Sequence, residues 1–244
     1  MSGYSEFYNC WIYEEADRWC VGFWISGNYF FNSKNLTKED VKNIKDKIDF
    51  KQFKKDGFHF IGNTQLIDKL SDHNSSFTLE SFKERYFYSL KEIHLKSKFS
   101  KEVNLASQED IQEIATLYQQ YYQEEYNGNN NKELTKTLEN FESLQLRKLI
   151  YSLKENDKVI GFCTIMTFLS PKPNMIGTIF IDVNFRNNGN GRHLLSFVVG
   201  EILKQNDELF LMTTKENISL NRMVESIGFR KCYEHSDRII KNHE

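Results

Sequence analysis

Apolar residues change their spacing several times along the second half of the chain, and each change marks an element. From 175 to 181 they follow one another almost without interruption, which is typical of a buried strand. A turn rich in asparagine and glycine follows at 187–192, and apolar residues then recur at helical spacing from Leu194 to Leu203. The pattern predicts a strand that turns through glycines into a helix.

The rest of the second half predicts further strands and helices around this unit. Ser107 followed by Asp110 is typical of a helix start, and Gly228 is typical of a helix end. The expected strands are 103–105, 149–154, 158–168, 175–182, 208–213, 229–234 and 237–241, and the expected helices begin near 107, 132, 191 and 217. This order predicts a mixed α/β sheet.

The first hundred residues have a different character, because they hold all three tryptophans and 21 of the 35 aromatic residues. Their pattern predicts strands at 7–13 and 20–31, a helix from Thr37 to about residue 55, a loop at 72–76 and a helix at 78–95. No repeat is evident between the halves. We therefore expect an N-terminal α+β region over 1–100 and a separate domain over 101–244.

Composition and charge argue against several classes of protein. The 244 residues are 39% hydrophobic with a net charge of −2, which is ordinary for a soluble globular protein and gives no basic footprint for nucleic acid. The apolar runs are too short to span a membrane, and the N-terminus has no signal-peptide pattern. The four cysteines are scattered, which predicts reduced thiols in the cytoplasm and no metal site.

The glycine turn is the first candidate for chemistry. A strand that turns into a helix presents free backbone N–H groups and the positive end of the helix dipole, and both attract phosphate. No Lys-Ser or Lys-Thr follows Gly191, so the turn is not a P-loop. Leu194 stands where a dinucleotide fingerprint has its third small residue, so a Rossmann site does not fit either.

Two segments together resemble the signature motifs of the GCN5-related N-acetyltransferase (GNAT) superfamily. Residues 181–191 resemble V-x-P-x-[YF]-[RQ]-x-x-G-x-[GA], with Arg186 at the Arg/Gln place, Gly189 and Gly191 at the small-residue places, and Val183 where proline is common. Residues 217–229 resemble N-x-x-[SA]-x-x-L-x-x-x-[LI]-G-F. The resemblance covers about residues 102–240.

The resemblance implies a fold and a donor site. The fold is a GNAT-like mixed, mostly antiparallel sheet flanked by helices, in which two parallel central strands, 175–182 and 208–214, splay apart. The backbone amides of the turn would hold the pyrophosphate of acetyl-CoA, and the main chain at the strand end would bond the pantetheine arm. The residues so assigned are Ile181, Val183, Arg186, Asn187, Asn188, Gly189, Asn190, Gly191, Arg192 and Asn217.

The resemblance also implies direct attack of a primary amine on the thioester within a ternary complex. An amine is protonated at neutral pH, so a base must take its proton, and an acid can protonate the leaving thiolate. The family's usual tyrosine acid falls on Val224, and its usual glutamate falls near Met212. Asp182 is the candidate base and Tyr233 the candidate acid, with a turn carboxylate and a packed core tyrosine as the structural alternatives.

Several alternatives stay open at this point. The missing acid and base leave room for a catalytically silent acyl-CoA-binding sensor or interaction module. Residues 1–100 are either a degenerate half-copy of the same fold or an unrelated cap that shapes the acceptor pocket. The expected partners are acetyl-CoA and an amine acceptor, either a small molecule or a protein amino group, with no nucleic acid, membrane or metal, in a monomer or homodimer.

Overall fold

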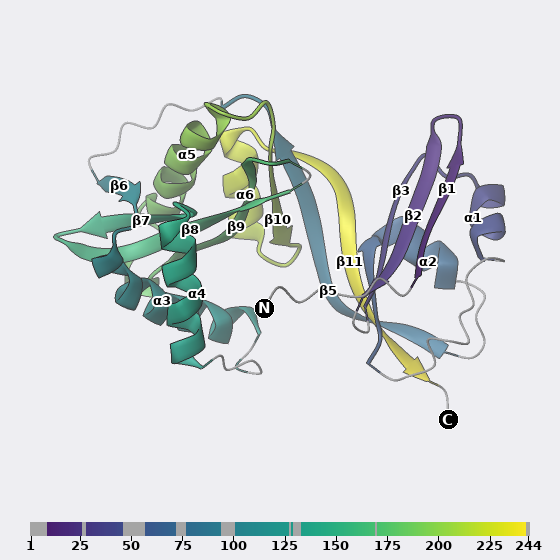
Figure 1. Ribbon diagram of the computed structural model, residues 1–244, viewed down its shortest axis with the longest axis horizontal. Coiled ribbons are helices and arrows are strands. Elements are labelled where there is room, and N and C mark those ends of the chain that lie inside the picture. Colours follow the sequence, from purple (N-terminus) through teal and green to yellow (C-terminus); the bar gives the residue numbers. More distant parts are fainter. Residues whose placement is uncertain are drawn as a thin grey trace. The chain divides into compact units, whose positions relative to one another are not determined.

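The computed structural model describes residues 9–25, 28–45, 57–71, 77–93, 101–126, 128, 133–168 and 170–242 (Figure 1). The chain forms two compact units. The first unit comprises Met1–Phe87, Thr213–Glu216 and Cys232–Glu244, and the second comprises Tyr88–Met212 and Asn217–Lys231. The boundary expected near residue 100 falls in 94–100, outside the described residues.

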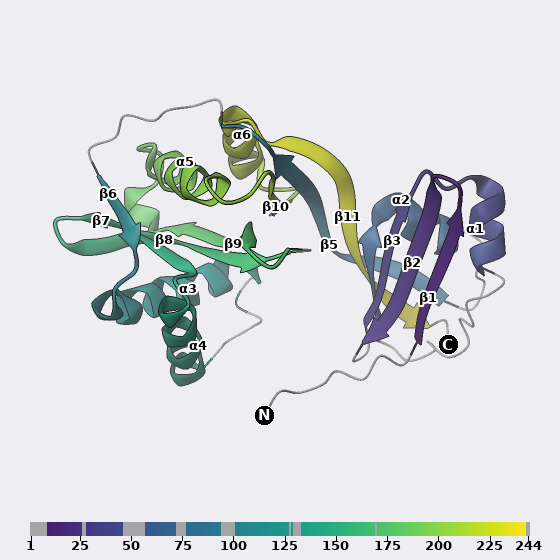
Figure 2. The ribbon, with the colours of Figure 1, turned by 45° about the horizontal axis from the view of Figure 1, so that its top comes forward.

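The second unit is a sheet with helices on both faces. Its elements are β6 (Glu102–Leu105), η2 (Gln108–Asp110), α3 (Ile111–Glu125), α4 (Leu134–Leu146), β7 (Ile150–Glu155), β8 (Lys158–Thr167), β9 (Pro173–Ile181), η3 (Val183–Phe185), α5 (Asn190–Leu203), β10 (Leu209–Thr214) and α6 (Ile218–Ile227). The strand order is β5-β10-β9-β8-β7-β6. Helices α3 and α4 cover one face, and α5 covers the opposite face (Figures 1 and 2). The mixed α/β fold is confirmed.

The helix start expected at Ser107 is confirmed as a reciprocal cap. The Ser107 N–H donates to Oδ2 of Asp110 at 3.0 Å, and the same oxygen accepts from the Ser152 hydroxyl at 3.0 Å. Nζ of Lys154 lies 2.6 Å from Oδ1 of this carboxylate. Burial opposes ionisation of Asp110, but these bonds prevail and hold its pKa below the usual range. Through Ser152 and Lys154, Asp110 therefore connects the turn before α3 to strand β7.

The first unit is also built on a sheet, formed by β1 (Asn9–Glu15), β2 (Arg18–Ile25), β3 (Asn28–Lys34), β4 (His59–Asn63), β11 (Arg230–Asn242) and β5 (Phe77–Leu90), in that order. Helices α1 (Lys38–Lys45) and α2 (Thr64–Ser71) follow β3 and β4. Strand β2 runs antiparallel to both β1 and β3, whereas β3 and β4 run parallel. Tyr29, Phe31 and Phe60 stack within its core.

Three expectations for strands and helices were wrong. The strand expected at 20–31 is two strands, β2 and β3, and the strands expected at 229–234 and 237–241 are one, β11. The helix expected at 78–95 is strand β5. Its apolar residues 79, 82, 86 and 90 match a helical period, but hydrogen bonding to strands on both sides outweighs that local preference. The loop expected at 72–76 lies outside the described residues.

The two units share one order of elements. Three antiparallel strands, a helix, a strand parallel to the third, a second helix and a long strand occur as β1-β2-β3-α1-β4-α2-β5 and again as β7-β8-β9-α5-β10-α6-β11. The second helix also begins alike in both, because Asn63 accepts from the Leu66 N–H at 3.2 Å and Asn217 from the Leu220 N–H at 3.0 Å. The described part of the first half therefore repeats the order of elements of the second half.

Strand β11 follows α6 in the chain, and it pairs with β4 of the first unit from His235↔Asn63 to Ile239↔His59. Residues Cys232–Glu244 accordingly belong to the first unit, far in sequence from its other strands.

Candidate functional site

The connection between β9 and α5 forms an uncapped helix start. Asn187 and Gly189 have left-handed backbone, with φ of 64° and 78°, which asparagine and glycine adopt most readily. Gly189 precedes α5 and has no side chain to cap it. Asn190, which is 4% exposed, donates from Nδ2 to the Phe185 carbonyl at 2.7 Å and so fixes the turn. The first amides of α5 thus remain for an anion, as the sequence predicts.

Strands β9 and β10 separate where this turn begins. Within the described residues, their parallel ladder contains one pair, Phe210↔Met175, near the start of both strands. Beyond it, β9 continues to Ile181 and pairs there with Gly161 of β8 on its other side. The splayed parallel strands implied by the resemblance are therefore present. An extended ligand arm can bond the unpaired edge of β9 as an added strand does.

The corresponding strands of the first unit are closed. Strands β3 and β4 pair at four successive positions, from Asn28↔His59 to Phe31↔Gly62. The closure depends on Gly62, because a Cβ there would lie 1.7 Å from the Phe31 carbonyl oxygen. Over the part of the chain that the structure describes, β3 and β4 therefore stay paired and do not splay apart.

The helix start of the first unit is closed as well. Oδ2 of Asp40 accepts from the Thr37 N–H at 2.8 Å, and Nε of Arg18 lies 2.9 Å from the same oxygen. The Tyr13 hydroxyl also donates to Asp40. These contacts, that of Tyr13 foremost, hold the pKa of Asp40 well below its usual range. The carboxylate of Asp40 therefore occupies the start of α1, whereas the start of α5 has no side-chain cap.

Arg186 and Arg192 bond protein groups with their side chains. Nε of Arg186 donates to the Ile181 carbonyl at 2.8 Å, and its Nη2 donates to Glu124 of α3 at 2.8 Å. Nη2 of Arg192 donates to the Ser226 hydroxyl of α6 at 2.7 Å. Arg186 thereby orients the end of β9, and Arg192 ties α5 to α6.

The other residues expected to bind the donor lie at this turn or, in the case of Asn217, at the start of α6. Asn187 and Asn188 are exposed, and Val183 is 62% exposed. A Cβ on Gly191 would lie 3.3 Å from Sδ of Met223, so glycine allows α6 to approach α5 closely. Asn217 is exposed and caps α6, as the sequence suggests. All of these residues belong to the second unit.

The candidate base, Asp182, is used in a turn. The side chain is 8% exposed, and Oδ1 accepts from both the backbone N–H and Nδ2 of Asn184 at 2.9 Å. It thereby caps η3 at the end of β9. The family's usual acid position, Val224, is fully buried and has no proton to offer.

The candidate acid, Tyr233, belongs to the first unit. Its ring stacks on Phe87 with centroids 4.9 Å apart. Burial raises the pKa of Tyr233 to about 12. The phenol is therefore protonated at neutral pH and can donate a proton but not accept one.

Two further side chains that could carry chemistry serve the core. Cys163 is fully buried, burial raises its pKa, and the thiol donates to the Thr164 carbonyl. Cys163 therefore behaves as a small buried hydrophobe. His193, which follows the glycine turn, is 6% exposed, and its Nε2 lies 2.8 Å from the Lys101 carbonyl oxygen.

The described ranges contain no group of three or more side chains suited to hold a metal ion. Nor does any helix in these ranges have the length and apolarity to cross a bilayer.

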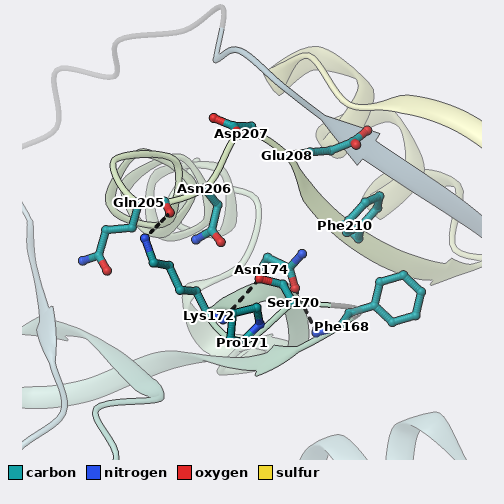
Figure 3. A pocket seen from close by; sticks show the side chains of 10 residues that line it. All are labelled: Phe168, Ser170, Pro171, Lys172, Asn174, Gln205, Asn206, Asp207, Glu208 and Phe210. Carbon is teal, nitrogen blue, oxygen red and sulfur yellow. Dashed lines mark hydrogen bonds between the residues drawn. The ribbon is translucent and has the colours of Figure 1, made fainter.

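A hollow of about 430 Å³ lies at the opposite ends of the splayed strands (Figure 3). Its walls come from the β8–β9 connection, including Phe168 and Lys172, from Asn174 at the start of β9, and from the α5–β10 connection, including Asn206. Lys172 crosses one side to donate to the Gln205 carbonyl at 3.2 Å. Because the glycine turn follows the end of β9 and this hollow precedes its start, the two are separate features.

Comparison with known proteins agrees with this geometry. The acetyltransferase (GNAT) domain family matches residues 103–244, more than half of the chain. The chain belongs to the GNAT acetyltransferase family. The match begins at β6 and covers the glycine turn, the splayed strands and α6. None of the curated proteins matches the chain.

Solved structures with the same fold are distant in sequence. A GNAT-family acetyltransferase from Colwellia psychrerythraea has a TM-score of 0.60 at 12% identity, over 91% of this chain and 85% of that one. A GCN5-related N-acetyltransferase from Sphaerobacter thermophilus has a TM-score of 0.58 at 12% identity, over 93% and 77%. A functionally unknown protein from Staphylococcus epidermidis has a TM-score of 0.57 at 12% identity, over 98% and 95%. The likeness extends over both units but shows the fold alone.

Proposed function

We propose that the chain is an acetyl-CoA-dependent N-acetyltransferase and that the second unit binds the donor. The uncapped start of α5 carries the proposal, because it leaves backbone amides and a positive dipole end for the pyrophosphate. The glycines allow the phosphates to approach the backbone closely. The start of α1, the corresponding helix of the first unit, is occupied by Asp40, and this difference supports a donor site in the second unit alone.

The pantetheine arm would lie along the edge of β9 that its splay from β10 leaves open. Its amide groups would bond the main chain at Ile181 and Val183, and Asn217 would bond it from the start of α6. Arg186 supports this arrangement through its bond to the Ile181 carbonyl. The thioester would then lie near the end of β9, where a backbone N–H can stabilise the developing oxyanion.

The reaction we propose is direct attack of a primary amine on the thioester. The new bond joins the amine nitrogen to the acetyl carbon, the carbon–sulfur bond breaks, and CoA leaves as the thiol. Asp182 as the base and Tyr233 as the acid stay predictions.

Release of CoA thiol in the presence of acetyl-CoA and a panel of amines tests the proposal. The panel contains small amines, amino acids, aminoglycosides and peptides with a free amino terminus. We expect thiol release with at least one class, and loss of release when CoA binding is lost. CoA binding without turnover across the panel would instead favour a silent acyl-CoA-binding module, and absence of CoA affinity would contradict both functions.

A further inference from the structure

Arg186 connects the end of strand β9 to helix α3 within the second unit. Its Nε donates to the Ile181 carbonyl at 2.8 Å, and its Nη2 donates to Oε1 of Glu124 on α3 at 2.8 Å. The guanidinium also lies over the Phe180 ring, with Cζ 4.9 Å from the ring centre. Because the guanidinium is flat, the two donated bonds and the ring contact together fix its position.

The peptide group between Ile181 and Asp182 is held at both its oxygen and its nitrogen. Its C=O accepts from Arg186, and its N–H, which belongs to Asp182, donates to the Ile160 carbonyl of β8 at 2.9 Å. A planar peptide bonded in this way cannot rotate without breaking one of the two bonds. The direction of the backbone groups at the end of β9, where the pantetheine arm would bond, therefore depends on Arg186.

Phe180 supports the guanidinium from the sheet. It is 6% exposed and belongs to the core that α3 and α4 cover (Figure 2). The Tyr121 ring of α3 contacts it edge-on, with ring centroids 6.1 Å apart. A cation over the face of an aromatic ring is attracted to it. Helix α3 therefore contacts the end of β9 through two residues three positions apart, Tyr121 by way of Phe180 and Glu124 by way of Arg186.

The location of Glu124 is not explained by its own helix. Glu124 stands in the last turn of α3, which has no basic residue. The C-terminal end of a helix carries partial negative charge, so a carboxylate is unfavourable there. The side chains of Glu124 and Arg186 are 51% and 34% exposed, and an ion pair this exposed adds little to the stability of a fold. What Glu124 does supply is a fixed partner for Arg186.

We propose that Glu124 is a positioning residue for the donor site, acting through Arg186 on the main chain at Ile181. This inference rests on the proposed function, since it assumes that the pantetheine arm bonds the end of β9. It assigns Arg186 to the protein backbone rather than to the phosphates of the donor.

The two roles of Arg186 predict opposite effects when Glu124 is removed. If Arg186 holds the backbone, loss of its partner loosens the end of β9 and weakens donor binding. If Arg186 instead contacts the phosphates, loss of Glu124 frees the guanidinium and removes a negative charge near an anionic ligand, and both changes tighten binding. The sign of the change in affinity therefore separates the two roles.

Calorimetric titration of CoA into the full chain and its variants tests the proposal. Glu124→Gln should weaken CoA binding about threefold, the size that a half-exposed ion pair supports. Glu133→Gln, which removes a carboxylate from the exposed pair with Lys136 at the start of α4, is the matched control and should leave CoA affinity unchanged. The melting temperature of Glu124→Gln should stay close to that of the unmodified chain, since the lost ion pair and the relieved helix end offset one another.

The nucleotide half of CoA, a phosphorylated ADP, locates the effect. It carries the phosphates without the pantetheine arm, so it would contact the glycine turn and not the end of β9. Glu124→Gln should therefore leave the affinity for this ligand unchanged. A loss of the same size for the nucleotide half and for CoA overturns the proposal, because the effect would not depend on the arm.

A double-mutant cycle tests whether Glu124 acts through Arg186. In an Arg186→Ala background, Glu124→Gln should cause no further loss of CoA affinity. A further threefold loss in that background overturns the proposal, as does an unchanged or tighter affinity for CoA in Glu124→Gln alone. An unmodified chain without CoA affinity contradicts the proposed function itself, so the two failures are distinguishable.

Discussion

Replacing Gly62 by alanine should destabilise the first unit strongly. The new Cβ would lie 1.7 Å from the Phe31 oxygen and 2.8 Å from its carbonyl carbon, and Gly62 has a φ of 148°. Strands β3 and β4 would have to separate by more than about 1 Å, which costs about two ladder hydrogen bonds at about 1 kcal/mol each. The unfavourable φ adds about 1 to 2 kcal/mol. The expected loss in the free energy of unfolding is therefore about 3 to 4 kcal/mol.

Urea unfolding followed by tryptophan fluorescence measures this loss, because all three tryptophans lie in the first unit. Gly200→Ala is the matched control, since a Cβ at that position in α5 would meet nothing within 4 Å. In a helix interior this change should stabilise by about 0.5 to 1 kcal/mol. A Gly62→Ala variant within about 0.5 kcal/mol of the unmodified chain would refute the argument that β3 and β4 are closed through this glycine.

Three further predictions concern single side chains. Burial, aided by Arg85, lowers the pKa of His235 to about 4. The same side chain has a pKa of about 6.5 in the unfolded chain, which therefore binds more protons, so the free energy of unfolding should fall by about 3 kcal/mol from pH 6.5 to 4. Urea unfolding across that range measures this fall, and the contribution of His235 should be missing in His235→Leu. Asp110→Ala should lower the free energy of unfolding by about 3 kcal/mol, because the Lys154 ammonium and the Ser107 N–H lose their partner. Thermal or urea unfolding measures the loss, and removal of the exposed Lys136 side chain, the control, should change stability by under about 0.5 kcal/mol. Arg186→Ala should weaken CoA binding about tenfold in calorimetry by freeing the Ile181 carbonyl, and equal affinity would refute that role.

The second unit could be predicted from sequence because its signals are local. The cap at Ser107 and Asp110, the glycine turn and the asparagine that begins α6 each depend on residues within a few positions of one another. The bond from Arg186 to Glu124 could not be predicted in this way, because the partners are 62 positions apart. Local signals locate the donor turn but not the side chains that support it.

The first unit was predicted poorly because its structure depends on distant strands. Strand β5 has a helical period, yet it lies between β11 and β10, which come more than a hundred residues later. The repeated order of elements could not be recognised from the sequence either, because the first unit has a Thr37–Asp40 cap where the second has the glycine turn. What the copies keep in common is the order of elements, which the structure alone makes visible.

Calorimetric titration of acetyl-CoA into the unmodified chain and an Arg192→Asp variant tests the central claim most directly. Residue 192 stands three positions after Gly189, as Asp40 stands three positions after Thr37, so the variant places a carboxylate at the helix start as in the closed copy. Arg192→Gln controls for loss of the arginine and its bond to Ser226. The account predicts that the unmodified chain binds acetyl-CoA and that Arg192→Asp, still folded, binds it at least about tenfold more weakly than Arg192→Gln. Equal affinity of these two variants, or no binding by the unmodified chain, would contradict the claim that the start of α5 is the phosphate site.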